Sequence, residues 1–173
     1  MSARPLRVAI VGAASSGKST LAEGLAARYR TLWVPEYLRE FVDTEGRVPV
    51  AEDQFHIALT QRDREDAAAP RANHYLFCDT TPLMTAVYSR RYFGGIDAQL
   101  APLADAHARD YALTLVTAPD IPWVEDVQRE SEEVCAIIHA MLLDELAARG
   151  IPYLLVCGDR EQRLAQVERH LSH

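Results

Sequence analysis

The fold is decided by the stretch Gly12-Ala13-Ala14-Ser15-Ser16-Gly17-Lys18-Ser19, which has the spacing G-x-x-x-x-G-K-[ST]. An apolar run, Leu6 to Val11, precedes it, and a helix-forming stretch, residues 20–27, follows it. In this setting the glycines let the backbone curl, so that successive N–H groups and a helix N-terminus face one polyphosphate. A turn that merely caps a helix is the alternative. Both glycines, the lysine, the serine and both flanks agree with a phosphate-binding loop (P-loop).

The loop residues have distinct expected roles in binding a nucleoside triphosphate. Lys18 is placed to reach the terminal phosphates, and the hydroxyl of Ser19 is placed to ligate Mg²⁺. The other residues expected to contact the triphosphate here are Gly12, Ser15, Ser16, Gly17 and Thr20. The sequence therefore predicts a protein that binds a nucleoside triphosphate with magnesium.

Length and charge narrow the class of protein. The 173 residues have the length of one domain, and the net charge of −7 argues against a general nucleic-acid-binding surface. A small-molecule partner is expected instead. The chain opens without a signal-peptide pattern and has no membrane-length apolar run, which predicts a cytoplasmic protein without membrane contact. The three cysteines form no C-x-x-C pair and stand in apolar stretches, which predicts buried thiols, no disulfide and no metal site.

Short apolar runs alternate with longer segments of helical periodicity. This alternation is typical of an α/β fold, in which a five-stranded parallel sheet lies between two layers of helices. The expected strands are Leu6 to Val11, Thr31 to Val34, Tyr75 to Cys78, Ala112 to Thr117 and Pro152 to Cys157.

Two expected helices near the C-terminus have clear sequence signals. The first ends at Arg149-Gly150, and the last begins at a capping box from Asp159 to Gln162. The apolar stripe of the first helix consists of Val134, Ile137, Ile138, Met141, Leu142 and Leu146. Leu164, Val167 and Leu171 share a face of the last helix.

Ligands of such folds bind at the carboxyl ends of the strands, where several polar residues stand. The carboxylate of Glu36 can accept the proton of an attacking hydroxyl, or it only interacts with a helix dipole. Arg39, one helical turn later, binds the acceptor or pairs with Glu36. Asp79 holds the Mg²⁺ shell or acts as the base, with a helix N-cap as the alternative. Asp159, after the fifth strand, is assigned to the nucleotide.

The stretch after the fourth strand, residues 117–129, is interrupted by prolines and too polar for another strand. Such a loop can close over a triphosphate and bring an arginine to the transferring group, and Arg129 is the candidate. Trp123 stacks on a flat ring or packs the base of the loop. Trp123 and Tyr37 are therefore the aromatic candidates for holding the acceptor.

Five motifs lie between Val8 and about Arg163: G-A-A-S-S-G-K-S-T-L, V-P-E-Y-L-R-E-F, F-C-D-T-T-P-L, A-P-D-I-P-W-V-E-D-V-Q-R and G-D-R-E-Q-R. As a set they resemble the nicotinamide riboside kinase domain of NadR-type proteins. The resemblance implies transfer of the γ-phosphoryl group of ATP to the 5′-hydroxyl of nicotinamide riboside, which gives nicotinamide mononucleotide in NAD salvage. It also implies an architecture related to nucleoside and nucleotide kinases.

The same resemblance implies roles for individual residues. The E-Y-x-R segment, with Glu36, Tyr37 and Arg39, matches the acceptor segment. The W-V-x-D-x-x-R segment of the family is matched by Trp123, Asp126 and Arg129.

The sequence also departs from the family pattern. Ala14 stands where the family commonly has Glu, Pro35 where it often has an aromatic residue, and Val127 where it usually has Gly. The chain has no room for the adenylyltransferase domain or DNA-binding segment of many NadR-type proteins, so another enzyme is expected to complete NAD.

The sequence thus predicts a single P-loop kinase domain over residues 1–173 that catalyses in-line phosphoryl transfer. Its catalytic residues are expected to be Lys18, Glu36, Asp79 and Arg129. Two alternatives stay open: a kinase for another nucleoside or small alcohol, and a regulatory module that binds ATP and hydrolyses it slowly. The sequence does not predict an oligomeric state.

Overall fold

Strand β1 (Leu6–Val11) lies at the centre of a five-stranded parallel sheet with the order β2-β3-β1-β4-β5. The computed structural model describes residues 4–121 and 131–172. β1 pairs with β3 in a register that sets Leu6 opposite Tyr75, and with β4 in a register that sets Val8 opposite Leu113. The other strands are β2 (Leu32–Val34), β3 (Tyr75–Asp79), β4 (Leu113–Thr117) and β5 (Leu154–Val156).

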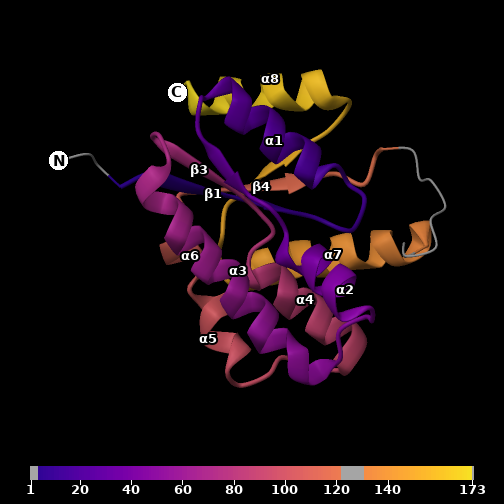
Figure 1. Cartoon of the computed structure of the whole chain (residues 1–173). Coiled ribbons are helices and arrows are strands. Elements are labelled where there is room, and N and C mark those ends of the chain that lie inside the picture. Colours follow the sequence, from indigo (N-terminus) through magenta and orange to yellow (C-terminus); the bar gives the residue numbers. More distant parts are fainter. Residues whose placement is uncertain (1–3, 122–130, 173) are drawn as a thin grey trace.

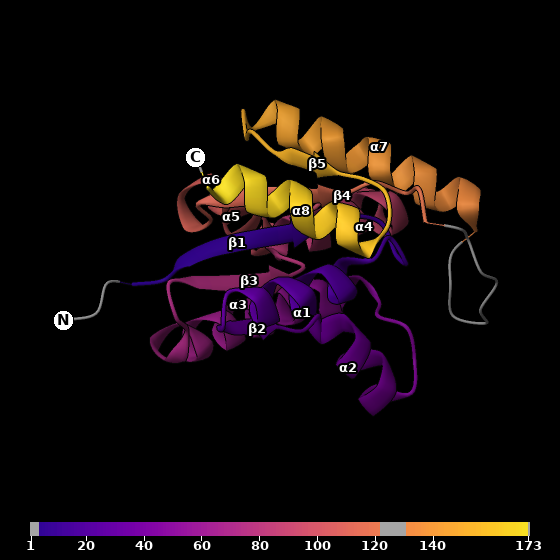
Figure 2. The ribbon, with the colours of Figure 1, turned by 90° about the horizontal axis from the view of Figure 1, so that it is seen from above.

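Helices cover both faces of this sheet. Figure 1 shows α1 (Lys18–Arg28) and α8 (Arg160–Leu171) together above it, and Figure 2 shows the same pair from above. The helices below it are α3 (Gln54–Ala68), α4 (Pro82–Phe93), α5 (Leu100–Asp105), α6 (His107–Asp110) and α7 (Glu132–Ala148). Helix α2 (Tyr37–Glu45) packs on α3, and short 3₁₀ turns span Ala51–Asp53 and Ala69–Arg71. The predicted three-layer α/β fold is confirmed.

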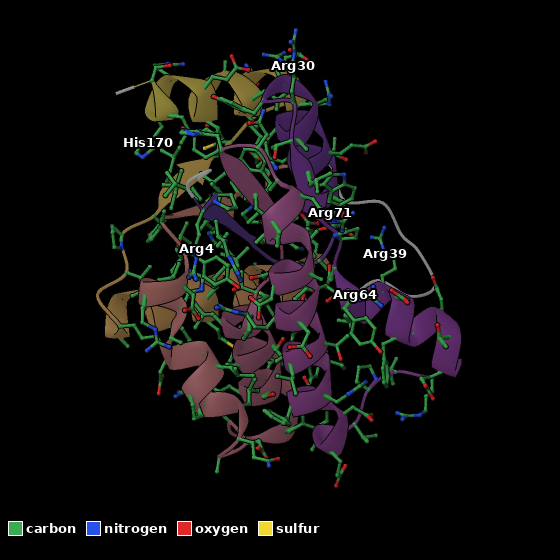
Figure 3. The ribbon with its side chains drawn as sticks, turned by 60° about the vertical axis from the view of Figure 1, so that its left-hand side comes forward. Arg4, Arg30, Arg39, Arg64, Arg71 and His170 are labelled. Atoms are coloured by element: carbon green, nitrogen blue, oxygen red, sulfur yellow. The ribbon has the colours of Figure 1, made fainter. Side chains whose placement is uncertain are left out.

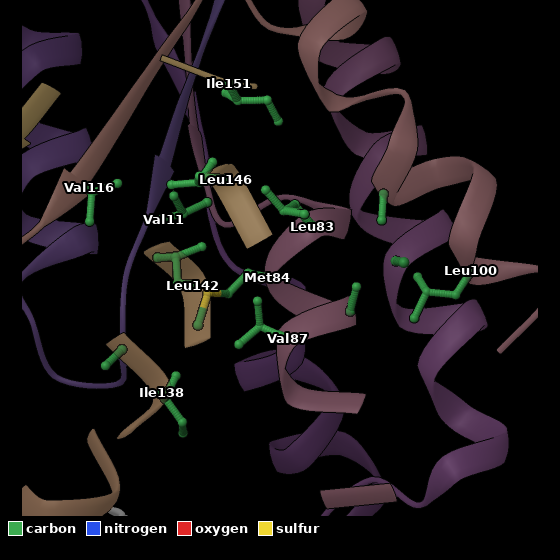
Figure 4. Close-up of a cluster of buried hydrophobic side chains, with 14 of the residues drawn as sticks. Val11, Leu83, Met84, Val87, Leu100, Val116, Ile138, Leu142, Leu146 and Ile151 are labelled. Atoms are coloured by element: carbon green, nitrogen blue, oxygen red, sulfur yellow. The ribbon is translucent and has the colours of Figure 1, made fainter. Parts of the chain in front are cut away.

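The central strand is buried on both faces because its side chains alternate between two cores. Val8 and Ile10 pack under α1 and α8, whereas Val11 packs against α4 and α7 (Figure 4). The lower core includes Leu83, Met84, Val87, Ile138, Leu142 and Leu146. The sheet is thereby fixed between helices, so the loops at its carboxyl edge start from rigid positions.

The structure corrects some details of the sequence prediction. The expected strands at 31–34, 112–117 and 152–157 begin one or two residues too early, and β5 starts only at Leu154. Pro152 has no N–H to donate to a strand ladder. Cys157 is exposed because it lies beyond the end of β5, where its backbone N–H and carbonyl bond the side chain of Gln166.

Helix α7 also differs in the residues that it buries. Ile137 is 40% exposed, whereas Cys135 is buried beside Ile138 and Leu142. The buried positions follow one narrow i, i+3, i+7 row, and Ile137 lies outside it. Within the described ranges, no helix combines the length and the apolar character needed to cross a membrane.

Candidate active site

The P-loop connects β1 to α1 and depends on two glycines. A Cβ on Gly12 would lie 2.1 Å from Oγ1 of Thr117, so only glycine lets the loop pass beside the end of β4. Gly17 has φ +88°, a left-handed conformation that L side chains rarely adopt, and helix α1 starts directly after it. The glycine spacing of the motif is therefore a requirement of the backbone.

The buried side chain of Ser16 hydrogen-bonds within the P-loop and to a neighbouring strand. Ser16 is buried, and its hydroxyl donates to the carbonyl of Ala13 at 2.7 Å and lies 2.6 Å from Oγ1 of Thr117. Thr117 is the last residue of β4, so the loop is tied to a neighbouring strand. The Ser16 side chain thus shapes the loop.

Lys18 lies at the start of α1 and folds back over the loop. Its ammonium donates to the Ala13 carbonyl at 3.1 Å, and the residue is only 6% exposed. It is also close enough to Glu36 to act on that carboxylate electrostatically. A cation held in this position is what a terminal phosphate requires.

Ser19 and Asp79 lie together, as the sequence predicts. The Ser19 hydroxyl donates to Oδ2 of Asp79 at 2.6 Å, and Asp79 is fully buried at the end of β3. Asp79 does not cap α4, because the N-cap of that helix is Thr81. The carboxylate and the hydroxyl therefore form one oxygen-rich corner beside the loop.

Glu36 stands at the N-terminus of α2, and its side chain makes no capping hydrogen bond. Burial raises the pKa of its carboxyl above the ordinary value, and the Asp79 charge adds to the rise. The Lys18 and Arg39 charges and a hydrogen bond from Thr80 lower it in part. A carboxylate with a raised pKa within electrostatic reach of a lysine is suited to accept a proton.

Gln61 joins the Glu36 segment to the end of β3. Its amide accepts from the backbone N–H of Tyr37 at 2.7 Å and donates to the carbonyls of Pro35 at 3.2 Å and Asp79 at 3.4 Å. Gln61 is 3% exposed, so these bonds hold the two acidic residues at a fixed separation.

Tyr37 and Arg39 face different surroundings. The ring of Tyr37 lies edge-on to Phe41, and the guanidinium of Arg64 lies over it, 4.9 Å from its centroid. Arg39 is exposed on α2, as Figure 3 shows. Among the described residues, Arg39 therefore influences Glu36 only through its charge.

Arg163 is a component of the site that the sequence reasoning missed. It lies on α8, is 2% exposed, and donates through Nη1 to the carbonyl of Ser16 in the P-loop. Nη2 donates to the Ala118 carbonyl at 2.9 Å and to the Asp120 carboxylate, and Nε to the Gly158 carbonyl at 3.0 Å. One guanidinium therefore joins the P-loop to the ends of β4 and β5. The only signal in the sequence was its place in the G-D-R-E-Q-R motif.

Asp159 is the N-cap of α8. Its carboxylate accepts from the N–H of Gln162 at 2.9 Å, and the Gln162 side chain accepts from the N–H of Asp159 at 2.8 Å, so the predicted capping box is confirmed. A hollow of about 70 Å³ lies nearby between Gly17, Thr20 and Arg160. Trp123, Asp126 and Arg129 lie outside the described residues.

Comparisons with known proteins agree with this geometry. The sequence model of a family described as an AAA domain matches residues 7–163. The trifunctional NAD biosynthesis/regulator protein NadR of Salmonella typhimurium is 34% identical over 123 residues, which are 69% of this chain and 30% of that protein. A crystal structure of a NadR protein in complex with NR has a TM-score of 0.76 at 25% identity, covering 96% of this chain and 51% of that chain.

A more distant likeness concerns the fold alone. Thymidylate kinase from Candida albicans has a TM-score of 0.67 at 16% identity, over 99% of this chain and 93% of that chain. The chain spans less than a third of the curated NadR protein and about half of the NadR chain in the crystal structure. The NadR resemblance of the motifs is confirmed, and because the family model matches nearly the whole described chain, this chain belongs to the AAA domain family.

Proposed function

We propose that this protein is an ATP-dependent kinase that phosphorylates the 5′-hydroxyl of nicotinamide riboside, the NR of the similar crystal structure. The observation that carries the proposal is that Gln61 ties the residues on both sides of Glu36 to Asp79, through bonds to the Tyr37 N–H and to the carbonyls of Pro35 and Asp79. A phosphate-binding loop alone occurs in enzymes with many reactions, whereas a proton acceptor near the loop favours phosphoryl transfer to an alcohol. The similarity to NadR supports nicotinamide riboside as that alcohol.

The proposed reaction is a single in-line displacement. The P-loop amides and Lys18 hold the phosphates of ATP, and Glu36 orients the 5′-hydroxyl and accepts its proton. A bond forms between the 5′-oxygen and the γ-phosphorus, the bond to the β,γ-bridging oxygen breaks, and ADP leaves. Asp79 is the alternative base, as the sequence leaves open.

Magnesium fits the corner formed by Ser19 and Asp79. Asp79 is a buried carboxylate without an ion pair to any described residue, and it accepts hydrogen bonds from the hydroxyls of Ser19 and Thr80, which are also oxygen ligands. No cluster of three or more His, Cys, Asp or Glu that could hold a metal occurs in residues 4–121 and 131–172. Mg²⁺ held here would therefore share its shell with water and ATP, and it would neutralise phosphate charge.

Other assignments stay predictions. ATP contacts by Ser15 and Asp159, acceptor contacts by Tyr37, Arg39, Trp123 and Asp126, and the closing role of Arg129 all belong to the proposed function. We also keep as predictions the single-domain organisation of residues 1–173, the cytoplasmic location and the absence of nucleic-acid and membrane partners.

An acceptor panel tests the proposal. Purified protein is given Mg·ATP with nicotinamide riboside, with thymidine, with adenosine or with no acceptor, and ADP release is followed. We expect release that depends on nicotinamide riboside and is lost in Lys18→Ala. Release with ordinary nucleosides alone would identify another nucleoside kinase, and slow release that no acceptor changes would identify a regulatory ATPase.

A further inference from the structure

Thr80, the residue that follows β3, has an unusual backbone conformation. Its φ is +76°, and among residues 4–121 and 131–172 it is the one β-branched residue with a positive φ. The left-handed region is rare for any residue with a side chain and a genuine outlier for a β-branched one, and such outliers cluster at functional sites. Glycine would adopt this φ without steric cost, so the backbone alone gives no reason for a threonine here.

Contacts on both sides fix the backbone of Thr80. Its N–H donates to the carbonyl of Ile10 at 2.8 Å, which continues the pairing of β1 with β3 past the end of β3. The next residue, Thr81, is fully buried and is the N-cap of α4. The Thr81 hydroxyl lies 3.2 Å from Nδ1 of His107, and Nε2 of that ring lies 2.9 Å from the hydroxyl of Thr114 in β4. The turn from β3 to α4 is therefore held from two directions.

The side chain of Thr80 lies at the acidic corner. The residue is 5% exposed, and its hydroxyl donates to Oδ1 of Asp79 at 3.5 Å. The Ser19 hydroxyl donates to Oδ2 at 2.6 Å, so each oxygen of Asp79 has its own hydroxyl partner. The Thr80 hydroxyl is also within hydrogen-bonding reach of the Glu36 carboxyl. It can therefore bond both acidic residues of the proposed reaction.

A hydroxyl suits a place between two carboxyls. The charges of Glu36 and Asp79 repel each other, so a neutral group that bonds either one stabilises the pair without adding charge. A hydroxyl has one proton to donate and two lone pairs, so it can donate to one carboxylate and still accept from a neighbour. The fixed turn and the left-handed φ together set the direction of the Cα–Cβ bond of Thr80, and that direction takes the hydroxyl to the carboxyls.

We propose that Thr80 is a positioning residue of the kinase reaction, whose hydroxyl holds the Glu36 and Asp79 carboxyls in a fixed relative orientation and whose strained backbone is retained for this purpose. The inference rests on the proposed function, because Glu36 is the base there. A base that is oriented before the acceptor binds needs less rearrangement to reach the transition state. The effect of Thr80 should therefore appear in kcat rather than in KM.

Three variants separate the hydroxyl from the backbone. Thr80→Val keeps the β-branched shape without the hydroxyl, Thr80→Ser keeps the hydroxyl, and Thr80→Gly removes the side chain but fits the left-handed φ. With Mg·ATP and nicotinamide riboside, we expect kcat to fall about 10- to 100-fold in Thr80→Val and Thr80→Gly, with both KM values within about threefold. Thr80→Ser should keep kcat within about threefold of the wild type.

Urea unfolding of the same proteins separates positioning from folding. Thr80→Gly should have a urea midpoint at or above that of Thr80→Val, because glycine relieves the backbone strain, yet both should lose kcat. Thr31→Val is the matched control, since the Thr31 hydroxyl donates to the Tyr75 carbonyl at 2.6 Å and accepts from the Asn73 N–H at 2.8 Å, at the amino edge of the sheet. It should lower the urea midpoint and keep kcat within about twofold.

The outcomes are distinct. A kcat within about threefold of the wild type in Thr80→Val would overturn the inference, and Thr80→Gly decides in the same way if Thr80→Val does not fold. A Thr80→Ser variant that loses as much kcat as Thr80→Val would also overturn it, because the hydroxyl would then not be the group that acts. If the wild type phosphorylates thymidine or adenosine instead of nicotinamide riboside, the proposed function is wrong, and the same variants compared with that acceptor decide this inference. A wild type that phosphorylates no acceptor refutes both.

Discussion

Replacing Arg163 by methionine should destabilise the protein and weaken ATP binding together. Methionine keeps much of the buried stem but removes every donor, so the carbonyls of Ser16, Ala118 and Gly158 lose a partner. Asp120, whose side chain is 38% exposed, can return to water and adds less. Losing the cation of a buried hydrogen-bonded network costs about 3–5 kcal/mol of the free energy of unfolding.

Urea unfolding followed by circular dichroism measures this loss. Arg169→Met is the matched control, since Arg169 is exposed on the same helix, and it should change the free energy of unfolding by less than about 0.5 kcal/mol. ATP affinity, measured by calorimetry, should fall in Arg163→Met because the Ser16 carbonyl loses the hydrogen bond from Arg163 that holds the P-loop in position. A free energy of unfolding within about 1 kcal/mol of the control would refute the reasoning.

Other predictions concern single groups. Lys18→Ala should abolish ATP binding while the circular dichroism spectrum stays unchanged; retained affinity would remove Lys18 from the phosphate site. Glu36→Gln should lower kcat about 10²–10⁴-fold while ATP affinity stays unchanged, because ionised Glu36 is the base. In the wild type, kcat/KM should rise with pH through a midpoint above the usual glutamate range, because the pKa of Glu36 is raised. Burial raises the pKa of Glu65 to about 7, so above pH 4.5 the folded state keeps a proton that the unfolded state releases. Relative to Glu65→Gln, the free energy of unfolding of the wild type, measured by urea unfolding, should therefore fall by about 3 kcal/mol between pH 4.5 and 7. The same pH dependence in both proteins would contradict this. Burial lowers the pKa of His107 to about 4, and NMR titration of its ring should find no charging near pH 6.5.

The sheet and the loop were predictable because their signals are local. A central parallel strand reads as a short apolar run, and the loop needs its glycines at fixed positions whatever surrounds them. Asp159 and Gln162 likewise form their capping box within four residues. Each of these features depends on neighbours in the sequence.

The features that the sequence did not predict depend on distant contacts. Arg163 and Ser16 are joined across 147 positions, so no spacing rule relates them. The burial of Ser89 depends on the packing of α4 against other helices. On α7, Ile137 belongs to an apolar stripe that is wider than the row that the core covers.

Phosphorus NMR of the complete reaction tests the central claim most directly. Protein, Mg·ATP and nicotinamide riboside are incubated together, and the phosphorus signals of ADP and of a phosphate monoester are integrated. The account predicts equal amounts of ADP and of a monoester coupled to the 5′-protons of the riboside, and neither product with Lys18→Ala. Inorganic phosphate in place of the monoester, or a monoester formed equally by Lys18→Ala, would contradict it.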